Sequence, residues 1–393
     1  MHPRQDQAIR ILEHLVGFES LPGMPTQDIV DYIKSYLQQQ GVECTLSFDD
    51  TGERANVFAT IGPPVDGGVL LNGHTDVIPV EGQQWLTDPF VLTRIDDKLY
   101  GRGSVDMKGF LACVLASVSQ WKNTGLRRPV HIAFTFDEEI GGFGMPALLR
   151  SMTEMKVKPA AVIVGEPTEG KLITGHKGGY EMRTEITGHE VHSSDPAMGV
   201  NAISVAMQLI NKIEEIGRRF ATNPYKDSPF VPPYATFNIG TIEGGLARNA
   251  TAGSCNFNWE LRPMPGEDGA SVIEEITAYA QQQLLPAMRH IHPDTDIKII
   301  TEVAVPALDD RNADEASALI SQLTGINSRG VVSFGSDAGY FSDAGYSTVL
   351  FGPGSISRAH KADEYIKVSE IDDGLCFMDK LTDKLKNNEA GTC

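Results

Sequence analysis

The sequence predicts a mixed α/β fold in which an outer domain is interrupted by an inserted α+β domain. In residues 1–178, apolar runs typical of buried strands alternate with helical patterns. In residues 179–304 the strands instead alternate apolar with polar residues, and the elements follow the order βαββαβ, typical of a ferredoxin-like layer. The first pattern resumes over residues 305–393, so the insertion divides the outer domain into two parts.

The outer domain is expected to begin with two helices. Apolar residues recur at helical spacing through residues 6–40, and a stretch rich in proline and glycine at 20–25 separates the helices. The remaining outer elements are apolar runs bounded by turn residues. They are strands at 56–61, 68–77, 130–136, 160–164 and 347–351 and helices at 109–121 and 146–152.

The inserted domain is expected to form one sheet with helices on one face. Its strands alternate like half-exposed strands, and its helices are amphipathic. These elements are strands at 180–186, 236–242, 254–261 and 296–303 and helices at 201–216 and 271–285.

Composition and charge restrict the class of protein. The 393 residues suit two domains. The 33 Lys and Arg against 52 Asp and Glu leave a net charge of −19, which argues against nucleic acid or an anionic membrane as a partner. We find no apolar run of the roughly 20 residues that span a membrane and no secretory signal. The cysteines are odd in number and scattered, which favours free thiols in the cytoplasm. They are Cys44, Cys113, Cys255, Cys376 and Cys393.

Histidines and carboxylates stand at or near the ends of four predicted strands, and one more follows a glycine-rich turn. A lone acid at a strand end usually only faces solvent, but the carboxyl ends of parallel strands meet at one edge of a sheet. Two histidines with three carboxylates suit zinc, cobalt or manganese, and zinc is favoured on ligand type. Five ligands exceed the need of one tetrahedral zinc and predict two divalent metal ions bridged by a carboxylate. The candidates are His74, Asp106, Glu138, Glu139, Glu166 and His360.

Two acidic positions suggest roles beyond metal binding. Residues two apart on a strand face the same side, so the Asp76 carboxylate should accept the second imidazole N–H of His74. For these two residues alone, a buried histidine satisfied by a neighbouring acid remains the alternative. Neighbours on a strand face opposite sides, so one of Glu138 and Glu139 should bind metal and the other act as general base on the attacking water.

Together these motifs resemble the M20 family of dinuclear-zinc deacylases and peptidases, and most closely its bacterial acetylornithine deacetylase branch. The resemblance implies a zinc-aminopeptidase-like catalytic domain with a mixed sheet and an inserted lid or dimerisation domain. The motifs are Gly73-His74-Thr75-Asp76, the glycine-flanked segment 103–109, Asp137-Glu138-Glu139, and the segments 164–168 and 352–360.

The resemblance also implies a role for each candidate residue. Asp106 would bridge both metals, with His74 and Glu166 completing one site and Glu139 and His360 the other. Glu138 would be the general base and Asp76 the partner of His74. The Asp106–Met107 peptide bond would be cis.

In the inserted domain, the segment 188–196 resembles the lid motif of the family. His192 would stabilise the oxyanion of an active site, in dimeric members that of the partner subunit. A surface histidine is the alternative for His192, and His189 is the competing candidate. Arg262 would pair with a substrate carboxylate, with an Arg–Glu surface pair as the alternative. Asn249 would approach the substrate or the oxyanion.

The resemblance predicts hydrolysis of N2-acetyl-L-ornithine to L-ornithine and acetate, in arginine biosynthesis. Ser336 and Asp337 stand where many acetylornithine deacetylases carry Thr-Glu, in a loop expected to line the substrate pocket, so the substrate stays open. The alternatives are the same chemistry on succinyl-diaminopimelate, acetylcitrulline or a dipeptide, and a non-catalytic binding protein on this fold. An exposed strand of the inserted layer would make a homodimer.

Overall fold

The computed structural model describes residues 2–386, and the chain forms two compact units. Unit 1 comprises the chain up to Gly175, Leu308–Val331 and the residues from Ser336 onward. Unit 2 comprises His176–Ala307 and Val332–Gly335. The mixed α/β class with a separate antiparallel layer is confirmed.

Unit 1 is built on an eight-stranded mixed sheet. Its strands are β1 (Cys44–Phe48), β2 (Ala55–Ile61), β3 (Val69–His74), β6 (Val130–Thr135), β7 (Ala161–Val164), β8 (Leu172–His176), β13 (Arg329–Val332) and β14 (Thr348–Leu350). They lie in the order β1-β2-β6-β3-β7-β14-β8-β13. The central strand β3 runs parallel to both β6 and β7, so the carboxyl ends of these three strands meet at one edge. A small sheet has the order β15-β5-β4. Its strands are β4 (Thr93–Ile95), β5 (Lys98–Tyr100) and β15 (Tyr365–Lys367).

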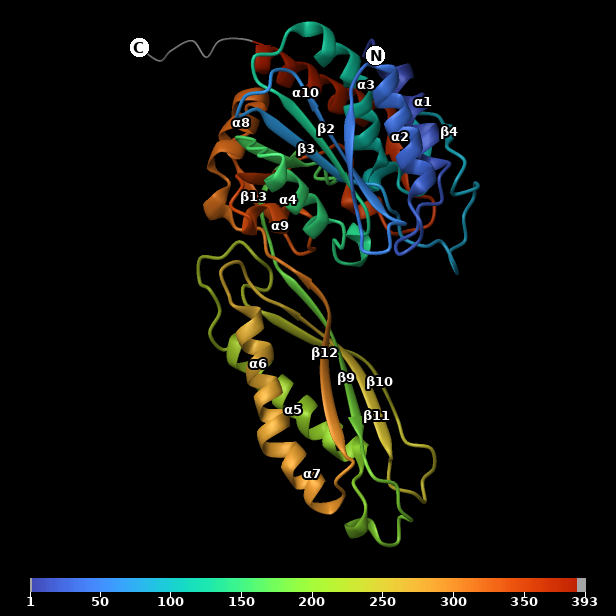
Figure 1. Ribbon diagram of the computed structural model, residues 1–393, viewed down its shortest axis with the longest axis vertical. Helices are drawn as coiled ribbons and strands as arrows, with labels where there is room; N and C mark the ends of the chain where they lie inside the picture. Colours follow the sequence, from blue (N-terminus) through green and yellow to red (C-terminus); the bar gives the residue numbers. More distant parts are fainter. Residues whose placement is uncertain (1, 387–393) are drawn as a thin grey trace. The chain divides into compact units, whose positions relative to one another are not determined.

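Helices cover both faces of the large sheet. Four of them gather on one side, as Figure 1 shows. They are α1 (Gln5–Val16), α2 (Gln27–Gln39), α3 (Gly109–Thr124) and α10 (Val368–Lys386). With α8 (Asp314–Thr324) they share a core to which Leu71 of β3 belongs. Its neighbour Leu70 is buried outside that core, because successive strand residues face opposite sides. Two further helices contact the sheet strands: α4 (Met145–Glu154) and α9 (Ala338–Asp343).

Unit 2 is one antiparallel sheet with helices along one face (Figure 1). The strands are β9 (Gly179–Thr187), β10 (Thr236–Gly244), β11 (Ser254–Arg262) and β12 (Asp296–Val305), in the order β10-β11-β9-β12. The helices are α5 (Ala202–Ala221), α6 (Gly269–Tyr279) and α7 (Leu285–Ile291). Alternate residues of β11, such as Phe257 and Trp259, are buried in the core that the helices share. This is the predicted ferredoxin-like arrangement.

The structure differs from the expected elements at several places, and it adds the short strands β4, β5, β13 and β15, which were not expected either. The strand β1 was not expected, because it is a half-exposed edge strand without a buried apolar run. The strand β8 was also missed, because it is short and its pattern is interrupted by Gly175. The strand expected at 130–136 ends at Thr135, and the acids after it lie in the short 3₁₀ helix η2 (Glu138–Ile140). The Asp106–Met107 peptide bond, by contrast, is cis as expected.

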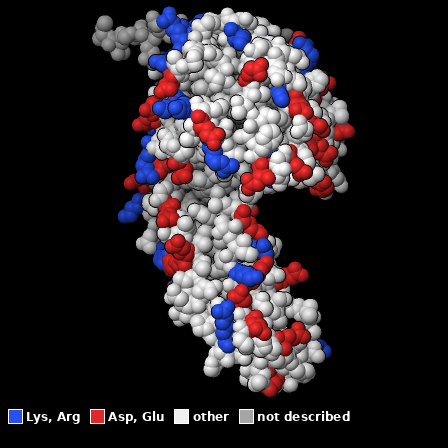
Figure 2. Space-filling view, viewed as in Figure 1, with Lys and Arg blue, Asp and Glu red and all other residues white. Residues whose placement is uncertain are grey.

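Surface charge and cysteines agree with the composition. Basic and acidic side chains are interspersed on the visible face (Figure 2). Within residues 2–386, no helix has the length and apolar character needed to cross a bilayer. The four cysteines in this range are free thiols. Cys393 lies outside the described residues.

Candidate metal centre

His74 is the last residue of β3 and is only 1% exposed. The residue before it is Gly73, where an added Cβ would lie 2.6 Å from the Met107 side chain and 2.7 Å from that of Leu111. A glycine at this position therefore lets the segment that carries Asp106 and begins α3 pack directly against the end of β3.

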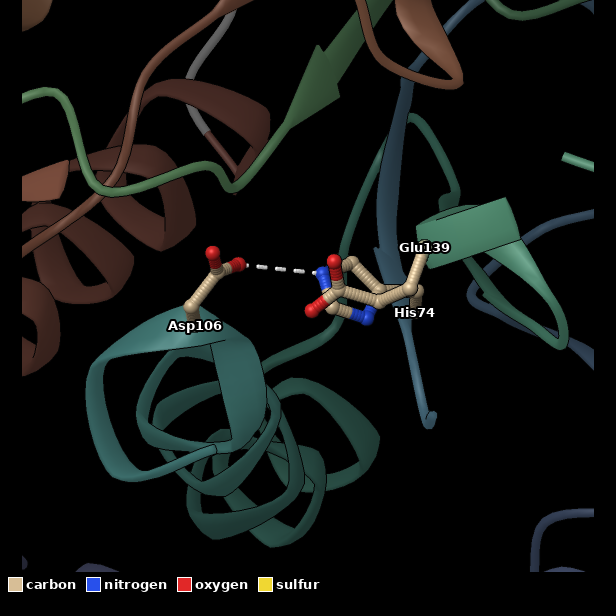
Figure 3. Close-up of side chains that lie close together, drawn as sticks. All are labelled: His74, Asp106 and Glu139. Atoms are coloured by element: carbon tan, nitrogen blue, oxygen red, sulfur yellow. Dashed lines mark hydrogen bonds and ion pairs between the residues drawn. The ribbon is translucent and has the colours of Figure 1, made fainter. Parts of the chain in front are cut away.

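Asp106 lies between two histidines. Its Oδ1 is 3.1 Å from Nε2 of His74, and its Oδ2 is 3.3 Å from Nε2 of His360. Nε2 of His360 is also 3.0 Å from Oε2 of Glu139. Figure 3 shows His74 from β3, Asp106 from the turn before α3 and Glu139 from η2 converging on one point. The two oxygens of Asp106 thus face different partners, which is the geometry of a bridging carboxylate.

Two more carboxylates lie near the same nitrogen of His74. Oε1 of Glu166 is 3.9 Å and Oε2 of Glu138 is 4.0 Å from its Nε2. Glu166 follows β7 and is 3% exposed, and its Oε1 has no hydrogen-bond partner among the described residues. A buried carboxylate oxygen without a donor is costly unless a cation pairs with it. This oxygen therefore supports a cation at the cluster.

Like charges lie close together in this cluster and shift the pKa values of its members. Burial, followed by the charges of neighbouring acids, raises the pKa of Glu138 and of Glu166 well above the usual value. Hydrogen bonds with Asp106 and Glu139 raise the pKa of His360 to about 10. Burial opposes a charge on His74, but its hydrogen bond with Asp106 and the nearby carboxylates raise its pKa. The acids and histidines thus shift one another's pKa values, and a divalent cation, which binds deprotonated ligands, would displace any protons that they hold.

The donor set fits metal ions. Ligand atoms of His74, Asp106 and Glu139 lie within 4.8 Å of one another, and so do those of His74, Glu138 and Glu166. His360 joins the first group through its contacts with Asp106 and Glu139. Imidazole and carboxylate donors suit zinc and its first-row neighbours. The structure therefore brings together all six candidate residues of the sequence analysis, five from at or near strand ends and Asp106 from the segment after the glycine-rich turn.

Asp76 makes different contacts from those expected. Nδ1 of His74 lies 2.9 Å from the backbone carbonyl oxygen of Asp76 and 3.7 Å from its carboxylate. The Asp76 carboxylate instead accepts hydrogen bonds from the backbone N–H groups of Glu138 (3.2 Å) and Glu139 (3.1 Å). The expectation took these two acids as strand residues, but they begin a helical turn whose first N–H groups need an acceptor. Asp76 therefore holds the turn that carries both glutamates.

Sequence reasoning missed the residues that brace this turn. Asp137, which has φ of 57°, accepts a hydrogen bond from the backbone N–H of Gly23 (2.8 Å) and pairs with Arg54. Arg54 is remote in sequence and carries no local signal. Glu364 was also missed as a functional residue, although it follows the motif that ends at His360.

Ser336 and Asp337, expected in a loop that lines the substrate pocket, are both buried, at 2% exposed. Oδ2 of Asp337 accepts a hydrogen bond of 2.6 Å from the hydroxyl of Thr135, the last residue of β6. Burial raises the pKa of Asp337 to about 6. The Ser336 hydroxyl accepts a hydrogen bond from the backbone N–H of Ala338 at the start of α9. Both residues thus brace the ends of unit 1 elements.

In unit 2, His192 and Asn249 lie on adjacent segments and are exposed. His192 bridges Ala250, and the carbonyl of Asn249 accepts a hydrogen bond from Ser193. Nδ1 of His192 accepts the backbone N–H of Ser194 (3.2 Å). In a neutral ring the proton then resides on Nε2, which remains as a donor.

Arg262 lies at the other end of the same sheet. It pairs with Thr236 at the start of β10, whereas His192 and Asn249 lie beyond the end of β10 at Gly244. The nine residues of β11 separate these ends, a span of roughly 27 Å. The Arg262 guanidinium is 2.9 Å from the Glu260 carboxylate, which is the surface pair considered as the alternative. One unit 2 therefore does not bring Arg262 and His192 together.

Comparisons with known proteins show which family and fold this chain shares. Residues 70–384 match the family model described as peptidase family M20/M25/M40. The chain is 31% identical to the acetylornithine deacetylase of Proteus mirabilis (strain HI4320), over 90% of this chain and 88% of that one. Among solved structures, the aminopeptidase PepT from Bacillus cereus ATCC 10987 superposes with a TM-score of 0.71 at 18% identity, covering 98% of this chain and 99% of its own. The YXEP protein of Bacillus subtilis, described as a dinuclear metal binding peptidase from the M20 family, has a TM-score of 0.64 at 15% identity and 98% coverage of both chains.

Proposed function

Since the chain belongs to peptidase family M20/M25/M40 and is a hydrolase of amide bonds, we propose that it deacetylates N2-acetyl-L-ornithine to L-ornithine and acetate. The observation that carries the proposal is the bridging arrangement of Asp106 between two histidines, within a cluster of buried acids. The similarity to a deacetylase over 90% of this chain supports the acyl amino acid as substrate. Arginine biosynthesis is the pathway that this reaction would serve.

The cofactors we propose are two divalent metal ions, with zinc favoured by the donor set. Asp106 would be shared, His74 and Glu166 would complete one site, and Glu139 and His360 would complete the other. When bound, such ions polarise the acyl carbonyl and make water a stronger nucleophile at neutral pH.

Glu138 is proposed as the general base. A carboxylate oxygen of Glu138 would take a proton from the attacking water and pass it to the nitrogen of the leaving amine. The Asp76 carboxylate would orient Glu138, because it accepts the backbone N–H of Glu138 and of Glu139. Burial of the Glu138 side chain supports this role, since a dry carboxyl group retains a transferred proton more readily.

His192 is proposed as the oxyanion donor through its Nε2. The separation of His192 from Arg262 within one unit 2 supports an arrangement in which the two act on different substrates, each His192 serving the partner subunit of a homodimer. The strand β10 is an edge strand with mostly exposed residues, so it is available for pairing across a two-fold axis.

A mixing experiment tests this dimer. Equal amounts of Glu138→Ala and His192→Ala protein, each nearly inactive, should regain about a quarter of wild-type activity after subunit exchange, because half of the dimers are mixed and each mixed dimer has one complete site. Absence of any recovery between proteins shown to exchange subunits would refute the role of His192 across the dimer.

Four further residues and the cellular location complete the proposal. Arg262 would hold the substrate α-carboxylate when it leaves Glu260. Asn249 would approach the substrate beside His192. Ser336 and Asp337 would shape the pocket through the elements they brace. Cytoplasmic location is proposed from the unpaired cysteines within residues 2–386.

Steady-state hydrolysis by zinc-loaded protein tests the function. Acetylornithine should give a higher kcat/KM than acetylcitrulline, acetylmethionine or succinyl-diaminopimelate, and Glu138→Ala should abolish turnover of all four. If another substrate gives the highest kcat/KM while Glu138→Ala is inactive, the result supports the proposed mechanism but contradicts acetylornithine as the substrate. Hydrolysis of none of the four by protein that binds metal would overturn acetylornithine as the substrate and direct the search to the loop around Asp337.

A further inference from the structure

Glu364 is a buried acid that the proposed reaction does not use. It is 1% exposed and lies four residues after His360. Its Oε1 accepts hydrogen bonds from the backbone N–H groups of Val105 (2.9 Å) and Asp106 (3.2 Å). Its Oε2 accepts a hydrogen bond of 2.7 Å from Nη1 of Arg102. One carboxylate thus holds the backbone of the proposed bridging ligand.

Arg102 connects the same carboxylate to the segment that carries His360. The guanidinium is 1% exposed, and its Nη1 also lies 3.4 Å from the carbonyl oxygen of Lys361. Its Nη2 donates to Oε1 of Gln83 (2.5 Å), and Nε2 of Gln83 donates to the carbonyl oxygen of His360 (3.4 Å). Both ligand-bearing segments are therefore joined to one buried ion pair.

Backbone bonds reinforce this junction. The N–H of Gly101 donates to the carbonyl of Glu364 (3.0 Å). The adjacent residues, Tyr100 of β5 and Tyr365 of β15, are paired in the small sheet. The segment before Asp106 and the segment after His360 thus meet at Glu364. A shift of either segment changes the distance between the Asp106 carboxylate and the His360 imidazole.

We propose that Glu364, paired with Arg102, is a positioning residue that sets the geometry of Asp106 relative to His360. The inference rests on the proposed function for the identity of these two ligands. The physical basis is that metal ligands are held by outer hydrogen bonds, whose loss lowers metal affinity about 10- to 100-fold. Because the hydrogen bonds of Glu364 and of its partner Arg102 go to the segments of Asp106 and His360, the loss of Glu364 should weaken the site completed by His360 more than the other.

Cobalt binding in the absence of substrate tests this inference. Apo protein is titrated with Co²⁺ by calorimetry and visible absorption, comparing wild type, Glu364→Gln and Thr382→Val. The Gln side chain keeps the shape of Glu364 but cannot accept from all three donors. The matched control removes the Thr382 hydroxyl, which accepts from Nε1 of Trp121 (2.8 Å) toward the far end of α3, so it loses a buried hydrogen bond away from both ligand segments.

We expect Thr382→Val to bind two Co²⁺ ions with the wild-type affinities and spectrum, even though it melts at a lower temperature. Glu364→Gln should bind one ion nearly as wild type does and the second at least 10-fold more weakly, with an altered absorption spectrum. Arg102→Lys, which keeps a cation beside Glu364 but loses the forked contacts, should weaken the same site less. It also serves as the test if Glu364→Gln does not fold.

The inference is overturned if Glu364→Gln and Arg102→Lys both bind two ions with wild-type affinity and spectrum, because Glu364 would then only stabilise the fold. The proposed function is decided separately by hydrolysis of the acyl amino acids. Wild type that binds two ions without hydrolysing any of them overturns that function alone, while the cobalt titration still decides the role of Glu364.

Discussion

His74, Asp106 and Glu166 of unit 1 are at most 4% exposed, whereas His192 and Asn249 of unit 2 lie at the surface. The buried group cannot exchange its protein partners for water, so each charge in it needs a counter-charge. The exposed pair has water as an alternative partner and needs no such compensation. Replacement of the buried ligands His74, Asp106 or Glu166 should therefore change metal binding and stability, whereas replacement of the exposed His192 should change turnover without changing stability.

Replacing Glu138 should have the largest effect on turnover, and it distinguishes the general base from the metal ligands of the buried cluster. Glu138→Gln should lower kcat by about 10³- to 10⁴-fold, because it removes a general base but retains the shape of the side chain. Metal content measured by atomic absorption should stay at the wild-type level. The control Glu139→Gln should instead lose metal, since Glu139 is 3.0 Å from His360 in the proposed second site. Loss of metal from Glu138→Gln would make Glu138 a ligand.

The second prediction concerns His192, which lies at the surface of unit 2. His192→Ala should lower kcat by about 10²- to 10³-fold, the usual effect of removing one oxyanion donor. Its melting temperature, followed by circular dichroism, should match that of wild type because the side chain is exposed. His189→Ala is the matched control on the same segment, where His189 stacks on His292 at 3.7 Å, and should keep its turnover. Equal losses in the two variants would contradict the assignment to His192.

The third prediction concerns the pH dependence of stability, which burial of His131 in unit 1 should produce. Burial lowers its pKa from 6.5 to about 4, so between these values the unfolded chain binds a proton that the folded chain excludes. Stability is therefore full above pH 6.5 and is lost as the pH falls toward 4, by roughly 2 kcal/mol between pH 7 and pH 5. His131→Gln, which does not titrate and can still bond to Thr60, should lose that much less over the same interval in urea unfolding. An identical loss in both proteins would show that His131 has the same pKa in the folded and the unfolded chain, contrary to this prediction.

The smallest effect is expected for an exposed ion pair of unit 2. Arg219 of α5 makes two hydrogen bonds with Glu275 of α6, of 3.0 and 2.7 Å. Glu275→Gln should lower the free energy of unfolding by less than about 1 kcal/mol, because solvent screens the pair. Hydrolysis should be unchanged. A loss of unfolding free energy as large as that expected at His131 would contradict the expected difference between buried and exposed charges.

Most of the fold could be predicted because it depends on local patterns. The period of the apolar residues distinguished buried strands from half-exposed ones and located the insertion. Only strands with a weak pattern were missed, as at Cys44–Phe48. Five of the six cluster residues were found for a related reason: parallel strands end at one edge, so histidines and acids at or near their ends converge. Asp106 follows a glycine-rich turn and was found through the motif that it belongs to.

The contacts that orient these residues could not be predicted in the same way. The sequence determined the elements, the candidate ligands and their common edge, since these follow from period, spacing and strand direction. Only the tertiary structure decided that Asp76 holds the turn of Glu138, that Thr135 holds Asp337, and that Glu364 holds Asp106. These bonds join residues between 62 and 258 positions apart. At such separations the sequence carries no periodic signal, and the partner is selected by which buried donor lacks an acceptor once the chain has packed.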